Sequence, residues 1–148
     1  MSTTFKYRLQ GPLDGLAADL TAEHRAPGAG AGAGADAGEG FRLRIYRKVW
    51  LAPPRGINWR DAAWLSFGLS VHSSDLSSVH PDGLLIEVAA LTFPLAHFRS
   101  EVAALAMDGW VRKEFDLPDR GLLAVFHSGS DGYRFHWGEN SDPFSDEF

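Results

Sequence analysis

The 148-residue chain contains no cysteine. Without a thiol it can form no disulfide, no thiolate zinc site and no iron–sulfur cluster, and it has no cysteine nucleophile. Long hydrophobic runs are also missing, because no stretch approaches the roughly 18 apolar residues that would cross a bilayer. The first residues, MSTTFKYR, lack the apolar segment of a secretory signal peptide. We therefore expect a cytoplasmic protein that does not enter a membrane.

Familiar catalytic and nucleotide-binding signatures are missing as well. The sequence has no GxxxxGK[ST] phosphate loop, no HExxH pair and no GxSxG nucleophile turn. Glycine is concentrated in residues 26–40, APGAGAGAGADAGEG, but nowhere at the GxGxxG spacing. This stretch alternates Gly and Ala and offers no side chain to bury, so it predicts a flexible insertion.

Apolar residues are plentiful enough to build a core. Hydrophobic residues make up 45% of the chain and aromatic residues 12%. A chain of this length fits one domain, which we assign to residues 1–137, including the insertion. Residues 138–148 carry four acidic residues and no basic one, so we expect a disordered acidic tail. The preference for Ala, Arg and Asp is typical of a high-GC bacterial genome.

Charge is distributed unevenly along the chain. Residues 1–60 hold nine Lys and Arg against five Asp and Glu, for +4. Residues 61–148 hold five Lys and Arg against fourteen Asp and Glu, for −9. The overall charge of −5 and the pI near 5.6 disfavour nucleic acid as the main partner. An acidic half suits docking onto a basic protein, although a solvated surface alone would also produce it.

Alternation of apolar and polar side chains predicts most of the strands, and it is clearest in residues 65–71. Residues 84–93 are almost continuously apolar, which predicts a strand in the centre of a sheet. The last two strands are expected to form a hairpin. The six predicted strands are residues 5–10, 41–51, 65–71, 84–93, 122–127 and 133–137.

Two helices are predicted, over residues 12–20 and 96–115. In the first, Leu13, Leu16 and Leu20 share a face, and in the second, Phe98, Val102 and Leu105 lie in one stripe. Asn58 and Asp61 resemble a helix N-cap pair, so a turn of helix is expected over residues 59–64. The order of the elements predicts an α+β fold with a mostly antiparallel sheet of about six strands and two helices packed on one face.

The most chemically suggestive segment is residues 72–82, expected to be a polar loop between two paired strands. In that geometry His72, Asp75, His80 and Asp82 would converge, as catalytic acid–base groups or as ligands for zinc, iron or manganese. Their spacing matches no known ligand rule, so a plain polar loop is the competing interpretation.

Three tryptophans, Trp59, Trp64 and Trp110, could line a ligand pocket between a helix and the sheet. Tryptophan is more often part of a core, because it buries a large area.

One face of the predicted strand over residues 41–51 is basic. Arg42, Arg44 and Lys48 alternate there with aromatic side chains, a composition that suits an anion-binding surface. The alternative is a solvent-facing edge strand protected by its charge.

Three functional hypotheses follow. The first is a small acidic interaction or regulatory module, with an immunity-like or accessory role, that binds a protein partner. The second is a small metal-dependent or acid–base enzyme of hydrolase type that uses His72, Asp75, His80 and Asp82. The third is a small-molecule binder with an aromatic pocket. The sequence requires no cofactor and identifies no metal.

Overall fold

The computed structural model describes residues 1–11, 15–27, 42–94, 99–127 and 132–143. Those residues form seven strands and three helices. The elements are β1 (Thr3–Leu9), β2 (Leu16–Arg25), β3 (Leu43–Tyr46), β4 (Val49–Ala52), α1 (Trp59–Ser70), α2 (Ser73–Val79), β5 (Leu84–Thr92), α3 (Val102–Phe115), β6 (Leu122–His127) and β7 (Gly132–Trp137). Within this described part, no helix combines the length and the apolar character needed to cross a membrane.

Two sheets form the β part of the structure. The larger has five strands in the order β1-β2-β5-β4-β3, and β6 and β7 make a separate two-stranded sheet. All neighbouring strands are antiparallel except β4 and β5, which are parallel. The predicted α+β class with a mostly antiparallel arrangement is therefore confirmed, and the expected number of elements roughly agrees with the structure.

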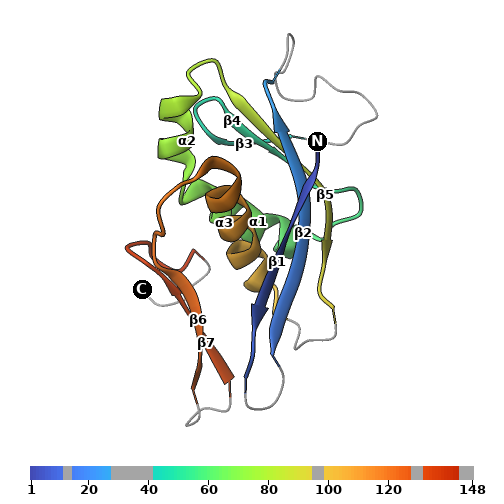
Figure 1. Cartoon of the computed structure of the whole chain (residues 1–148), viewed down its shortest axis with the longest axis vertical. Helices are drawn as coiled ribbons and strands as arrows, with labels where there is room; N and C mark the ends of the chain where they lie inside the picture. Colours follow the sequence, from blue (N-terminus) through green and yellow to red (C-terminus); the bar gives the residue numbers. More distant parts are fainter. Residues whose placement is uncertain (12–14, 28–41, 95–98, 128–131, 144–148) are drawn as a thin grey trace.

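Three layers are visible in Figure 1: the five-stranded sheet, then α1 and α3, and then the β6–β7 hairpin on the other side of α3. Because α3 has neighbours on several sides, every residue from Val102 to Val111 is buried. The helices α1 and α3 cross closely, since a Cβ atom added at Gly68 would lie 2.5 Å from the carbonyl oxygen of Ala104.

The helix predicted over residues 12–20 is wrong, because residues 16–25 form the strand β2. Leu16, Ala18, Leu20 and Ala22 point to the core in strict alternation. Leucines at i and i+4 fit a strand as well as a helix, since both residues also lie on the same face of a strand. Residues 12–14 lie outside the described part.

The single strand predicted over residues 41–51 is instead a hairpin. Strands β3 and β4 pair antiparallel, and the two-residue turn between them is Arg47 and Lys48. Arg47 has a φ of 50°, in the left-handed region that a tight turn uses. The two ends of the expected strand therefore run in opposite directions, and residue 41 lies outside the described part.

The strand predicted over residues 65–71 is also wrong, because the helix α1 runs from Trp59 to Ser70. The predicted cap that starts this helix is confirmed: the Asp61 N–H donates to Asn58 Oδ1 at 2.8 Å. The serines that suggested alternation bond within the helix, Ser66 to the carbonyl of Ala62 and Ser70 to that of Phe67. A polar side chain satisfied in this way does not need to face water.

The later elements agree better with the sequence. Strand β5 lies in the centre of the larger sheet, as its apolar run predicted. Helix α3 begins at Val102, later than expected, and residues 96–98 lie outside the described part. The terminal hairpin is confirmed by β6 and β7. Most of the predicted insertion over 26–40 and part of the predicted tail, residues 144–148, are outside the described residues.

Candidate functional site

Of the four residues predicted to form a catalytic or metal cluster, His72 points into the protein. It precedes α2 and its side chain is fully buried. Its Nε2 atom lies 2.7 Å from Asp108 Oδ1 on α3. Asp75 instead lies on the surface of α2, where its carboxylate is ion-paired with the guanidinium of Arg120. These two side chains therefore have separate environments.

The other two members lie at the end of α2 and beyond. His80 caps the helix C-terminus, with Nδ1 3.0 Å from the carbonyl oxygen of Leu76 and its ring edge-on to Phe115 at 5.4 Å between centroids. Asp82 is exposed in the turn that leads to β5. Within the described residues, no group of three or more His, Asp or Glu side chains could hold a metal ion. The convergence expected of these four residues is therefore absent, because residues 65–71 form a helix rather than a strand paired with β5.

A buried charged network was missed by the sequence analysis. Asp108, 3% exposed in the middle of α3, accepts from His72 through Oδ1 and from Arg112 Nη1 through Oδ2, at 3.2 Å. Arg112 Nη2 also lies 3.7 Å from Asp119 Oδ2. The His72 Nδ1 and Arg112 Nε atoms are buried without a hydrogen-bond partner among the described residues. The network joins the end of α1 to α3 and to the loop that follows α3.

Tyr7 on β1 is electrostatically coupled to the same region. Burial raises the pKa of Tyr7 to about 12, and the neighbouring Tyr133 and the carboxylate of Asp108 add to the increase. A negative phenolate would be unfavourable beside a buried carboxylate, so the neutral form of Tyr7 is stabilised in the fold.

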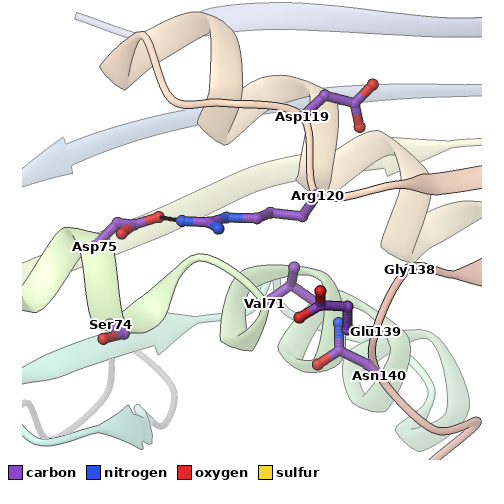
Figure 2. A pocket seen from close by; sticks show the side chains of 8 residues that line it. All are labelled: Val71, Ser74, Asp75, Asp119, Arg120, Gly138, Glu139 and Asn140. Atoms are coloured by element: carbon purple, nitrogen blue, oxygen red, sulfur yellow. Dashed lines mark hydrogen bonds and ion pairs between the residues drawn. The ribbon is translucent and has the colours of Figure 1, made fainter.

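A surface groove of about 490 Å³ lies beside this network, and Asp119 belongs to both. It lies between three segments: the α1–α2 junction, the loop after α3, and the turn after β7 (Figure 2). We call it the acidic groove, and it is lined by Val71, Ser74, Asp75, Asp119, Arg120, Gly138, Glu139 and Asn140. The sequence analysis had singled out only Asp75 among these residues.

Negative charge predominates in the acidic groove, because its lining includes three carboxylates and one cation. Figure 2 shows Arg120 reaching across to Asp75, with which it is paired. The carboxylate of Asp119 accepts the backbone N–H of Gly121 at 2.8 Å and remains largely exposed. Glu139 is exposed in the turn after β7.

A close approach of two backbones shapes one side of the acidic groove. Gly138 has a φ of 68°, and a Cβ atom there would lie 2.0 Å from the carbonyl oxygen of Arg120. Only glycine fits this position, since it alone accepts both the left-handed conformation and the contact. Gly138 therefore holds the turn that carries Glu139 against the loop that carries Arg120.

Two of the three tryptophans predicted to line a pocket border the same hollow in the described part of the chain, and the third, Trp110, does not line it. Trp110 is buried against β1, where its Nε1 donates to the Thr3 hydroxyl at 3.0 Å. Trp59 is 71% exposed and Trp64 is buried. Trp59 and Trp64 do border a surface hollow of about 290 Å³, with Arg60, Ser100, Glu101 and Asp142.

Trp64 also takes part in an aromatic contact between α1 and the second sheet. Its ring lies 5.1 Å from that of Trp137, and Phe67 meets Trp137 edge-on at 5.3 Å. Phe135 stacks on Trp137 at 5.7 Å. Such contacts add to the energy of area burial, so this cluster attaches the β6–β7 hairpin to the core.

Two of the three predicted anion-binding residues lie together. Arg44 and Lys48 border a hollow of about 410 Å³ with Arg47, Ser77 and Pro81. Arg42 does not line this hollow. Arg47 was missed because a continuous strand would have placed it on the opposite face from Arg44 and Lys48.

Comparison of the chain with protein-family models, with curated protein sequences and with solved structures finds no match.

Proposed function

We propose that this chain is a small interaction module that binds a protein partner by accepting a basic side chain in the acidic groove. The observation that carries the proposal is the composition of the groove: Asp75, Asp119 and Glu139 come from three separate segments and surround one hollow with a single cation. A lysine or arginine of a partner would bring the charge that this lining lacks.

Arg120 supports this interpretation by occupying part of the groove. Its guanidinium pairs with Asp75 and so occupies the position that a partner's arginine would take. Both side chains are partly exposed. A partly exposed ion pair contributes little stability, so the exchange of one guanidinium for another has a small cost. Asp119 and Glu139 are then available for the rest of a basic segment.

The buried network supplies a fixed frame for one of these carboxylates. Arg112, held by Asp108 on the preceding helical turn, lies 3.7 Å from Asp119. The N–H of Gly121 orients the other oxygen of Asp119. A carboxylate positioned before binding loses less side-chain entropy when the partner arrives.

The test uses a fluorescently labelled hexa-arginine peptide as the probe, with binding followed by fluorescence anisotropy. The groove variant is Asp119→Asn with Glu139→Gln. The matched control is Glu23→Gln with Asp82→Asn, which removes the same charge from sites outside the groove. We expect the groove variant to weaken binding about tenfold, and the control to weaken it about twofold or less.

Added salt should weaken the binding of the unchanged protein, because exposed ion pairs are screened. Equal losses of peptide affinity in the groove variant and in the control would contradict the proposal, because they would mean that only the net charge of the protein attracts the peptide. Absence of measurable binding to the unchanged protein at low salt would contradict it as well.

A further inference from the structure

Three cations lie together at the turn between β3 and β4, and none of them lines the acidic groove. Arg47 and Lys48 form the turn itself, and Arg44 precedes it on β3. All three are exposed, and they border the hollow of about 410 Å³ described above. We call these three residues the basic turn.

Local bonds orient the two guanidinium groups. Arg44 Nε donates to the carbonyl oxygen of Arg47 at 2.6 Å. Arg47 Nε donates to the Tyr46 hydroxyl at 3.1 Å, and its guanidinium carbon lies 5.4 Å from the centre of that ring. Each arginine thus uses its Nε atom within the turn. As far as the described residues go, the two terminal nitrogens of each group are left for a ligand.

The opposite wall of the hollow comes from α2 and the turn after it. The Leu84 N–H donates to the carbonyl oxygen of Lys48 at 3.0 Å, which fixes the basic turn beside the start of β5. Ser77 and Pro81 complete the lining. The Ser77 hydroxyl adds a neutral hydrogen-bond donor on the side facing the three cations.

The basic turn differs from most of the arginines in the described residues because it has no acidic partner there. Among those residues, no carboxylate is ion-paired with Arg44, Arg47 or Lys48. Five other arginines are paired with carboxylates, namely Arg8, Arg25, Arg99, Arg112 and Arg120. Positive charge at the basic turn is therefore not neutralised by the part of the chain that the structure describes.

We propose that the basic turn binds a phosphate group, either free or carried by a small molecule. A phosphate has up to two negative charges and three acceptor oxygens, which match two guanidinium forks and one ammonium better than a single carboxylate does. The volume of the hollow lies within the range of small-molecule sites, so it can also accommodate an organic group attached to the phosphate. This site shares no lining residue with the acidic groove, so its test does not depend on the proposed function.

The experiment measures binding by isothermal titration calorimetry at constant ionic strength, with inorganic phosphate and glycerol phosphate as probes and chloride as the reference. The variants are Arg44→Gln and Lys48→Gln. The control is Arg134→Gln, an exposed arginine on β7. We expect each of the two variants to raise the Kd about tenfold and the control to leave it unchanged.

Lys48→Gln keeps the bonds between Arg44, Arg47 and Tyr46, so it separates loss of ligand contact from rearrangement of the turn. Tighter binding of glycerol phosphate would assign the site to a phosphate ester, and equal binding would assign it to free phosphate. No heat beyond that of chloride, or equal Kd values in the variants and the unchanged protein, would overturn the proposal.

Discussion

At the scale of single residues, the buried carboxylate of Asp108 has the most demanding environment. It receives hydrogen bonds from both His72 and Arg112, and it is almost fully buried. A buried acid is tolerated when its oxygens are satisfied, and it is costly when one partner is removed. If Asp108 were absent, the buried His72 ring would lose its hydrogen-bond partner, and Arg112 would lose the shorter of its two ion pairs described above.

We therefore expect Asp108→Ala to lower the free energy of unfolding by about 1–3 kcal/mol, because it leaves Nε2 of the buried His72 without its hydrogen-bond partner. Urea denaturation followed by circular dichroism measures this loss. Asp82→Ala is the control, since Asp82 is exposed and the expected change is within about 0.5 kcal/mol. A similar change in both variants would show that Asp108 is not a structural partner of His72.

The raised pKa of Tyr7 predicts that the protein loses stability at alkaline pH. The pKa of Tyr7 is raised from 10.0 to about 12 in the folded protein, so folding favours the protonated phenol. Its contribution is fully present below pH 10.0 and is lost as the pH rises toward about 12. The variant Tyr7→Phe cannot ionise, so its stability should fall less over this interval.

Denaturant titrations of the unchanged protein and of Tyr7→Phe, at several pH values in this interval, give the difference between the two free energies of unfolding. Comparing the two proteins cancels the titration of the other tyrosines and of the lysines. A constant difference across the interval would contradict the assigned pKa.

Prediction from the sequence succeeded at this scale where the interaction is local. The cap at Asn58 depends on Asp61, three residues away, so the pattern alone identified it. His72 was selected as a candidate catalytic or metal-binding residue, and its partner in the structure, Asp108, is 36 positions away in sequence. That pairing exists only because α1 and α3 cross, which no local pattern reveals.

At the scale of elements, the crossing of α1 and α3 depends on glycine. A methyl group at Gly68 would lie 2.5 Å from the Ala104 carbonyl oxygen, which is backbone and cannot rotate away. At Gly109 the added methyl would lie 2.2 Å from the ring of Phe5, a side chain on an edge strand that can move. An alanine at position 68 would therefore require the backbone to move, whereas an alanine at position 109 would require only a side chain to move.

Gly68→Ala should destabilise the protein by about 1–3 kcal/mol, the usual cost of overpacking, although alanine favours helices. Gly109→Ala should cost less. Melting temperatures from differential scanning calorimetry compare the two variants directly. The close packing of α1 on α3 would be disproved if Gly68→Ala melted at the same temperature as the unchanged protein or higher.

The errors in element assignment have one physical cause. In residues 65–71 the buried apolar positions of a helix coincide with an alternating pattern, because Ser66 and Ser70 satisfy their hydroxyls on helix carbonyls. In β2 a strand was mistaken for a helix, because Leu16 and Leu20 are four positions apart and that spacing fits one face of either element. The run of Leu84, Leu85 and Ile86 was less ambiguous, because all three are buried, so this first part of β5 is covered on both faces.

At the scale of the whole molecule, the β6–β7 hairpin is joined to the core through aromatic packing. Trp137 is buried between Trp64 and Phe135. A two-stranded sheet of this size is marginal without such support, so the hairpin and the remaining layers should unfold as one unit.

Trp137→Ala is expected to lower the free energy of unfolding by about 3–5 kcal/mol. The unfolding curves from tryptophan fluorescence and circular dichroism should still coincide in a single transition. His136→Ala, a change to an exposed residue on the opposite face of β7, serves as the control and should have little effect. Two separate transitions in the unchanged protein would contradict a single domain.

The candidate sites were only partly accessible from sequence for a reason that belongs to this scale. Asp75 was selected, but the acidic groove also needs Asp119 and Glu139, and these meet only because Gly138 contacts Arg120. Arg44 and Lys48 were selected from a strand pattern, yet the turn that brings Arg47 to them ends that strand. The sequence showed which residue types were present, but it did not show which loops and turns lie side by side in the fold.

The position of β5 has a consequence for the order in which the protein assembles during synthesis. The hairpins β1–β2 and β3–β4 are both made before β5, yet β5 lies between them and, among the described strands, it alone joins them. Until the ribosome has released residues 84–92, β2 and β4 each expose an unpaired edge. Such edges are sites of aggregation, so the nascent chain is most vulnerable in this interval, and completion of one central strand ends it.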